Sequence, residues 1–357
     1  MYVHEYSGHH RAALVLEKAF KALYPKTECQ VIDALRYAHP VLERFVRRTY
    51  LQIIKRSPEV WERLYDNPWV LKNAENLRRA IHQSDSHKFK RLLDQFHPDA
   101  VVCTQAFPCG VMSHYKSSFG YSIPLYAVLT DFSPHSYWIL NEVDRFFVAT
   151  NEAKEWLCEN AVLRGRISVT GIPIDLSFSH KAPSKARTIP PLVLIMGGGL
   201  GIGPIDKIVM TLDRLEEDFE MAVVAGKNKK LYRKLNERKK SLKKRTKVYS
   251  YVDSMSDLMR SASLLVSKPG GLTVAEALAS GLPVIFIDPI PGQEAKNASF
   301  MLKNRSAVEA RTEEEVGLFT AQLLRAPVKM ESMKKNMARL ARPDAALRIA
   351  AEIARGD

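Results

Sequence analysis

Short apolar runs alternate with longer amphipathic stretches along almost the whole sequence, and this alternation most restricts the folds open to the chain. The apolar runs have the length of β-strands, and the stretches between them have helical spacing. Strands that alternate with helices predict βαβ units and therefore parallel sheets. The expected strands of the first half are Cys29–Asp33, Ala100–Thr104, Leu125–Thr130, Arg145–Ala149 and Ile167–Thr170. Those of the second half are Leu192–Met196, Glu220–Ala225, Lys247–Tyr251, Ser263–Val266, Val284–Ile287 and Ala307–Ala310.

The two sets of strands are separated by a proline-rich segment, residues 171–191, whose composition is typical of an interdomain linker. We therefore expect an α/β protein with two doubly wound parallel-sheet domains, residues 1–170 and 192–338, that face each other across a cleft. A last helix within residues 339–357 is expected to return to the first domain. Only Met1–Tyr6 remain for a strand ahead of the first helix. Doubly wound sheets bind ligands beyond the carboxyl ends of their strands, so functional residues are expected in the loops that follow the strands.

The chain has 357 residues, enough for two domains, and a formal net charge of +14. This excess of cations indicates an anionic partner: nucleic acid, an anionic membrane surface or a phosphorylated substrate. No apolar run approaches the roughly 18–20 residues of a membrane span, and the first residues lack the pattern of a signal peptide. The four cysteines form no CxxC pair and no disulfide framework, so a reducing, cytoplasmic environment is expected.

The strongest motif runs from Ser267 to Leu278 and reads SKPGGLTVAEAL. A buried strand leads into a Pro-Gly-Gly turn, and a helix begins near Thr273. Glycines let backbone N–H groups approach an anion, and the helix dipole adds positive potential. Glu276, one turn into the helix, is suited to a ribose diol. A tight strand–helix turn with an exposed Glu276 is the alternative explanation.

Two further loops follow strands of the second half. Residues 197–204, GGGLGIGP, hold five glycines in seven positions, which favours a closely approaching phosphate or substrate over a plain turn. The loop after Ile287 is stiffened by prolines and supplies the polar side chains of Gln293, Glu294 and Asn297, which suit a hydroxyl-rich ligand such as a sugar. Taken alone, these three residues are better explained by a capped helix start.

In the first half, His9 lies at a helix start, where an imidazole with a near-neutral pKa is suited to general-base chemistry. Asp131 follows an expected strand and is either a base, a residue that orients one, or a turn residue. The segment Arg44–Trp69 mixes cations with aromatic residues, as a lipid-headgroup interface does, and a packed helical pair is the other interpretation. Residues 227–247 hold 12 Lys or Arg and one acidic residue; they predict a surface helix with a solvated basic face.

Taken in order, these motifs resemble family 28 glycosyltransferases, in the branch of monogalactosyldiacylglycerol synthases and processive diacylglycerol glucosyltransferases. The motifs that carry the resemblance are Gly8-His9, Pro98 to Thr104, Thr130-Asp131-Phe132 with His135 and Trp138, Asp144 to Ala149, Gly171-Ile172-Pro173, Gly197 to Pro204, Gly226-Lys227-Asn228, Lys268 to Leu278, and Pro291 to Glu294 with Asn297.

The resemblance implies a GT-B fold and a metal-independent enzyme that moves a hexose from UDP-glucose or UDP-galactose to diacylglycerol with inversion. It also implies a peripheral position on the cytoplasmic face of the cell membrane, where the anionic surface is a partner, and no cofactor, no metal and no nucleic acid. The residues implied for the donor are Gly199, Val252 (near uracil), Gly270, Gly271 and Thr273 (diphosphate), Glu276 (ribose), Gln293, Glu294 (sugar) and Asn297. Those implied for the acceptor side are His9 and Asp131 as catalytic groups, with His135 for acceptor or membrane. Composition, rather than the resemblance, adds Arg47, Arg48, Trp61 and Trp69 of the segment Arg44–Trp69 as acceptor or membrane residues.

Three alternatives remain at the level of sequence. A lipid-linked N-acetylglucosaminyltransferase of peptidoglycan synthesis would share the fold and the donor loops. A catalytically silent homologue that binds UDP-sugar or membrane is suggested by Glu5-Tyr6-Ser7-Gly8, which stands where the family usually has several glycines. A basic nucleic-acid binder ranks last, because no stacking aromatics accompany the basic segment.

Overall fold

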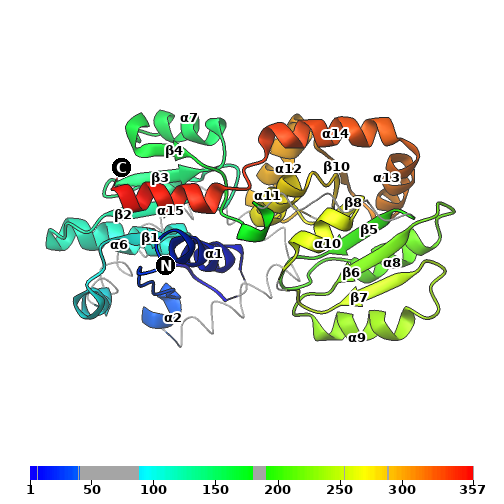
Figure 1. Ribbon diagram of the computed structural model, residues 1–357, viewed down its shortest axis with the longest axis horizontal. Helices are drawn as coiled ribbons and strands as arrows, with labels where there is room; N and C mark the ends of the chain where they lie inside the picture. Colours follow the sequence, from blue (N-terminus) through cyan, green and yellow to red (C-terminus); the bar gives the residue numbers. More distant parts are fainter. Residues whose placement is uncertain are drawn as a thin grey trace. The chain divides into compact units, whose positions relative to one another are not determined.

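The computed structural model describes residues 1–5, 7–38, 40, 88–179, 190–252, 254–287 and 289–356. These residues divide into two compact units, each with its own parallel sheet (Figure 1). The first unit comprises Met1–Pro173, Ile290–Gln293 and Ala345–Asp357, and the second comprises Ile174–Pro289 and Glu294–Asp344. The predicted α/β class with two parallel-sheet domains is confirmed. No helix in these described ranges has the length and hydropathy needed to span a membrane.

The second unit is built on a six-stranded parallel sheet in the order β10-β9-β8-β5-β6-β7. Along the chain, β5, β6 and β7 follow one another toward one edge of the sheet. The next strand, β8, lies on the other side of β5, and β9 and β10 continue toward the opposite edge. This reversal is the doubly wound arrangement, and its switch point lies between β5 and β8. The strands are β5 (Leu192–Met196), β6 (Glu220–Val224), β7 (Thr246–Tyr249), β8 (Leu264–Ser267), β9 (Val284–Ile287) and β10 (Ala307–Ala310).

Helices cover both faces of this sheet, because every residue of β5 is buried and such a strand needs apolar partners on each side. One face packs Val193 and Ile195 of β5 against Val209 and Leu212 of α8. The helices of this part of the chain are η3 (Leu176–Phe178), α8 (Ile205–Asp213), α9 (Lys229–Arg238), α10 (Ser256–Ser261), α11 (Gly271–Ser280), α12 (Gln293–Lys303), α13 (Glu313–Arg325) and α14 (Pro327–Leu340).

The first unit holds a four-stranded parallel sheet in the order β1-β2-β3-β4. Its strands are β1 (Val101–Cys103), β2 (Leu125–Val128), β3 (Arg145–Val148) and β4 (Ile167–Val169). Its helices are α1 (Gly8–Leu23), α2 (Ala34–Ala38), residues 88–96, α6 (Ala106–Phe119), η1 (Ser136–Trp138), α7 (Asn151–Glu159), η2 (Arg164–Arg166) and α15 (Ala345–Arg355).

The start of the chain extends this sheet without forming a strand. The carbonyl of Met1 accepts the N–H of Thr104 at 3.0 Å, and Tyr2 forms a single parallel bridge with Asp33. The strand expected over Cys29–Asp33 is therefore wrong, and Met1–Glu5 contain only the single bridge residue Tyr2. The chain turns into α1 directly after this bridge, since Ser7 caps that helix by accepting the N–H of His10 at 3.1 Å. That leaves too few residues for a ladder of hydrogen bonds.

The C-terminal helix α15 belongs to the first unit and packs beside α1 (Figure 1). Ile349 and Ile353 of α15 join Leu16 of α1 and Phe147 of β3 in one buried apolar cluster. The helix thus covers one face of the four-stranded sheet together with α1. Residues from the two ends of the chain share this core.

Candidate functional site

Two glycine-rich turns leave the six-stranded sheet side by side at its switch point. Met196 ends β5 and is paired with Ser267, which ends β8. The turns 197–204 and 268–270 begin with the next residue of each strand. Because the switch point is where doubly wound sheets bind ligands, this edge of the second unit is its candidate ligand site.

The turn after β8 presents backbone N–H donors at the start of α11. The N-cap residue, Gly270, has an extended backbone (φ −64°, ψ 143°) and adds no side-chain acceptor. The N–H of Val274 bonds to the carbonyl of Gly270 at 2.9 Å. The N–H groups of Gly271 and Thr273 therefore lie in the first turn, ahead of this bond, where the helix dipole also favours an anion.

Buried polar side chains support this turn. Asn297 of α12 is fully buried, and its Nδ2 donates to the carbonyl of Pro269 at 3.1 Å. Glu276 of α11 is only 4% exposed, although a solvated carboxylate was one interpretation of the motif. Asn297 thus fixes the backbone that leads to Gly270. The direct donor contacts expected of Asn297, Glu276 and Thr273 stay predictions.

The turn after β5 needs glycine for its own packing. A Cβ atom on Gly197 would lie 2.3 Å from the carbonyl oxygen of Ile202, and one on Gly201 would lie 2.0 Å from that of Ala225. Both distances are impossible contacts, and Gly201 also has a positive φ of 60°. These two glycines are explained by loop packing alone. Gly198, with a φ of +66°, faces open space.

The loop after β6 holds the turn after β5 in place. The N–H of Lys227 donates to the carbonyl of Gly199 at 2.9 Å. The Nζ of Lys227 lies 4.4 Å from the centroid of the Tyr251 ring, within the range of a cation–π contact. Val252 follows Tyr251 and is partly buried. The ends of β5, β6 and β7 are thereby joined, and the proposed uracil contact of Val252 and donor contact of Gly199 stay predictions.

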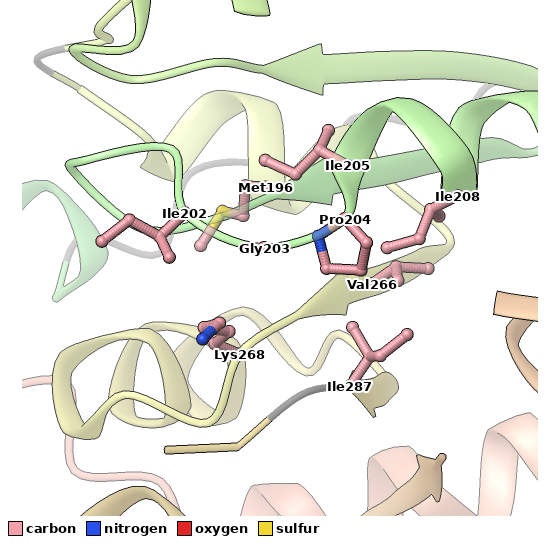
Figure 2. A pocket seen from close by; sticks show the side chains of 9 residues that line it. All are labelled: Met196, Ile202, Gly203, Pro204, Ile205, Ile208, Val266, Lys268 and Ile287. Atoms are coloured by element: carbon pink, nitrogen blue, oxygen red, sulfur yellow. The ribbon is translucent and has the colours of Figure 1, made fainter. Parts of the chain in front are cut away.

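A small pocket lies between the two glycine-rich turns, and Figure 2 shows its lining. Its single charged lining residue is Lys268, which stands opposite the Gly203–Pro204 stretch in that view. A cation in apolar surroundings attracts an anion more strongly than one in water, because the local dielectric constant is lower. The remaining lining residues are Met196, Ile202, Gly203, Pro204, Ile205, Ile208, Val266 and Ile287.

Gln293, the first residue of α12, carries a buried amide with unused hydrogen-bonding capacity. Its Oε1 and Nε2 find no hydrogen-bond partner within the described part of the chain. A buried polar group left without a partner costs about 1–3 kcal/mol. A hydroxyl-bearing ligand would satisfy both atoms, which agrees with the predicted sugar contact. Glu294 follows it and is partly buried.

In the first unit, His9 is held by residues that follow two neighbouring strands. Its Nδ1 lies 3.0 Å from the carbonyl oxygen of Thr104, after β1, and 2.7 Å from Oγ1 of Thr130, after β2. A carbonyl oxygen can only accept, so the Nδ1–H of His9 donates to Thr104. In the neutral ring, this leaves the lone pair on Nε2.

The protonation of His9 is shifted by its surroundings. Burial lowers the pKa of His9 below 6.5, and the nearby charge of Asp131 partly opposes that effect by raising it. The imidazole is therefore neutral near pH 7, with Nε2 able to accept a proton. The structure thus places His9 and Asp131 close enough for the charge of Asp131 to influence the pKa of His9.

The other acceptor-side residues are placed less fully. The ring of His135, on the loop after β2, lies 5.4 Å from that of Tyr137 and 6.1 Å from that of Trp138, between ring centroids. The predicted residues Arg47, Arg48, Trp61 and Trp69 lie outside the described residues. Nowhere in the described ranges do three or more His, Cys, Asp or Glu side chains gather as a metal site would need.

Sequence reasoning missed three residues of these sites. Lys268 stands inside the quoted motif, and its position before the Pro-Gly-Gly turn was the available signal. Thr104 and Thr130 contact His9 across 95 and 121 positions of sequence. No local pattern reports a contact over such a separation.

Comparison with solved structures agrees with the fold described above. MurG from Acinetobacter baumannii superposes with a TM-score of 0.65 at 15% identity, covering 99% of this chain and 98% of that chain. HepE from Anabaena, in complex with UDP-glucose, has a TM-score of 0.51 at 13% identity, covering 77% and 82%. These likenesses show the fold.

Sequence comparison goes further. Residues 9–174 match the monogalactosyldiacylglycerol synthase family, and residues 192–349 match the C-terminal domain of glycosyltransferase family 28. A processive diacylglycerol beta-glucosyltransferase of Bacillus cereus is 33% identical over 358 residues, covering 96% of this chain and 89% of that protein.

The two parallel-sheet units, with glycine-rich turns at the switch point of the second, have the GT-B fold of solved glycosyltransferases. The two family models define the chain as a glycosyltransferase. The chain belongs to family 28 of these enzymes, in the branch of the monogalactosyldiacylglycerol synthases and processive diacylglycerol glucosyltransferases.

Proposed function

We propose that the protein transfers a hexose from UDP-glucose or UDP-galactose to diacylglycerol, inverts the anomeric carbon and needs no metal ion. The observation that carries the proposal is the 33% identity, over 96% of the chain, to a processive diacylglycerol beta-glucosyltransferase. The arrangement of the donor-side turns supports it, because it supplies cationic and N–H groups of the kind that a departing diphosphate requires.

The nucleotide part of the donor is held by the second unit in this proposal. The first-turn N–H groups of Gly271 and Thr273, together with Lys268, stabilise the negative charge that builds on the departing UDP. Oriented dipoles and a fixed cation do this without reorganisation during the reaction. The ribose binds Glu276, and uracil binds the backbone near Val252. The sugar binds Gln293 and Glu294, while Gly199 and Asn297 complete the donor site.

The acceptor is activated by the first unit. The hydroxyl oxygen of diacylglycerol attacks the anomeric carbon, a new carbon–oxygen bond forms, and the bond from that carbon to UDP breaks. The hydroxyl proton passes to Nε2 of His9, and the charge of Asp131 stabilises the imidazolium that results. His135, Arg47, Arg48, Trp61 and Trp69 are assigned to acceptor or membrane contacts.

Each domain has one role in this proposal. Residues 1–170 form the acceptor domain, residues 192–338 form the donor domain, residues 171–191 link them, and the helix within 339–357 completes the acceptor domain. The enzyme works on the cytoplasmic face of the cell membrane as a peripheral protein, because its acceptor is a bilayer lipid. The lipid-linked N-acetylglucosaminyltransferase alternative is less favoured, since MurG is only 15% identical.

The test is UDP release on mixed vesicles containing diacylglycerol, with EDTA present and with UDP-glucose, UDP-galactose and UDP-N-acetylglucosamine offered separately. We expect release with one of the two hexose donors only when diacylglycerol is present. The variant Glu276→Gln is expected to weaken UDP binding by roughly 10–100-fold, as loss of a charge-assisted hydrogen bond does.

Two results would contradict the proposal. Release with UDP-N-acetylglucosamine alone would favour the peptidoglycan-type reaction. UDP binding without release from any donor would identify a catalytically silent homologue.

A further inference from the structure

Helix α9 and the loop after it carry an excess of exposed cations on one side of the second unit. Leu231 and Leu235 of α9 are buried against the core, 8% and 2% exposed. The helix lies along β7, the strand at one edge of the sheet (Figure 1). Its opposite side therefore faces solvent. We call six exposed cations of that side, of the following loop and of β7 the basic face: Lys229, Lys230, Arg233, Lys240, Lys243 and Lys247.

The basic face is not neutralised by the protein itself. Neighbouring cations do have partners: Lys234 pairs with Asp206, and Arg245 pairs with Glu220 at 3.0 Å. The six residues of the basic face form no ion pair with any residue that the structure describes. Their charge is therefore available to an external anion.

Helix stability does not explain these cations. Lys229 and Lys230 stand in the first turn of α9, which contains no acidic residue. The helix dipole makes cations unfavourable at that end. Helix α13 of the same unit shows the favourable arrangement, with Glu313, Glu314 and Glu315 in its first turn. The lysines of α9 thus oppose the stability of their own helix, which points to a binding role.

We propose that the basic face binds the anionic headgroups of a phospholipid bilayer. This inference rests on the proposed function, whose acceptor is a bilayer lipid. A membrane is favoured over RNA because Tyr232 of α9 packs against the core and the ring of Tyr251 is contacted by Lys227. None of the six residues of the basic face is aromatic, so they offer no ring for base stacking, and the one exposed acidic residue of α9 is Glu237. Attraction to a charged surface needs no such ring.

The experiment measures sedimentation with phosphatidylcholine vesicles, with and without an equal part of phosphatidylglycerol, at low and high salt. We expect binding only to the anionic vesicles, and less of it at high salt. The triple variant Lys229→Gln, Lys230→Gln, Arg233→Gln should bind more weakly by about fivefold for each charge removed, and so by more than tenfold in total. Its melting temperature should equal or exceed that of the unchanged protein, because the dipole conflict is relieved.

A matched control removes the same net charge elsewhere. Lys329, Lys335 and Arg339 are exposed on α14, and changing all three to Gln also lowers the net charge by three. This variant should bind anionic vesicles almost as well as the unchanged protein. Equal losses in the two variants would reduce the effect to net charge and overturn the proposal. Loss of RNA binding in the α9 variant with vesicle binding unchanged would overturn it in favour of nucleic acid.

A second assay separates this inference from the proposed function. Transfer to diacylglycerol dispersed in uncharged detergent micelles should proceed equally in the α9 and α14 variants. On anionic vesicles, the α9 variant alone should be slow. Absence of transfer in every format would defeat the proposed function, while the sedimentation results would still decide whether the basic face binds lipid.

Discussion

At the scale of the single residue, the direction of one hydrogen bond decides which nitrogen of His9 can act. Since Thr104 offers a carbonyl oxygen 3.0 Å from Nδ1, the proton of the neutral ring stays on Nδ1. Thr130 adds a hydroxyl contact at 2.7 Å that holds the same edge of the ring. The basic atom is consequently Nε2, and the two threonines act as positioning residues.

His9→Gln should lower the rate of transfer by roughly 10²–10⁴-fold while leaving UDP affinity unchanged, since a general base acts on the acceptor. In the unchanged enzyme, burial lowers the pKa of His9 below 6.5, so activity should rise with pH through that lowered value and then level off. Rate measurements over a pH series with saturating donor test this. A pH profile of the same shape in His9→Gln would contradict the assignment.

The same pKa shift makes a linked prediction for stability. A histidine whose pKa is lowered by folding stabilises the protein above the unfolded value of 6.5, and this contribution is lost as pH falls through the lowered pKa. Denaturant unfolding on either side of pH 6.5 should therefore show a smaller acid-side loss in His9→Gln than in the unchanged protein.

At the scale of the element, the turn after β5 separates two reasons for glycine. Gly198 and Gly201 share nearly the same left-handed backbone, with φ of +66° and +60°. Only Gly201 is also packed against the chain, where a Cβ would meet the carbonyl of Ala225 at 2.0 Å. Backbone conformation and close packing can thus be tested separately within one turn.

Gly198→Ala should cost about 1–2 kcal/mol of unfolding free energy, the price of a left-handed non-glycine residue. Gly201→Ala should cost about 1–3 kcal/mol more, because the loops must also move apart. Urea unfolding of the two variants checks the difference. Equal losses would mean that the packing of this turn against the loop after β6 is looser than described.

At the scale of the whole molecule, the last helix completes the core of the first unit. Ile349 of α15 is fully buried against Leu16, Tyr126, Val128 and Phe147. A destabilising substitution in α15 should therefore lower the stability of the four-stranded sheet.

Ile349→Ala should destabilise the first unit by about 2–5 kcal/mol, as buried large-to-small changes do. Hydrogen exchange should show the loss at the amides of β2 and β3. The neighbouring change Glu352→Gln serves as control: its contact with Arg145 is 3.7 Å long and partly exposed, so about 0–1 kcal/mol is expected. Equal effects of the two changes would argue against a core role for α15.

What could be predicted from sequence follows from where each signal lies in the chain. The donor-side turns could be found because strand, glycines and helix start are consecutive residues, and β5, β9 and β10 match their expected bounds. The strand expected over Cys29–Asp33 failed because its partner, Tyr2, supplies a single bridge. The supports of His9 could not be found, since Thr104 and Thr130 reach it only through the pairing of β1 with β2. The packing need for Gly201 was equally hidden, because Ala225 belongs to another loop.

The place of α15 also sets an order of events during synthesis. A chain leaves the ribosome from its first residue, and domains generally fold as units once their sequence is available. The second unit, which needs nothing beyond Asp344, can complete itself first. In the first unit, the sheet face that bears Tyr126, Val128 and Phe147 is covered by α1 alone until α15 emerges. The half that is made first is thus finished last, and the part of its sheet face that α15 will cover is an apolar surface to which a chaperone can bind in that interval.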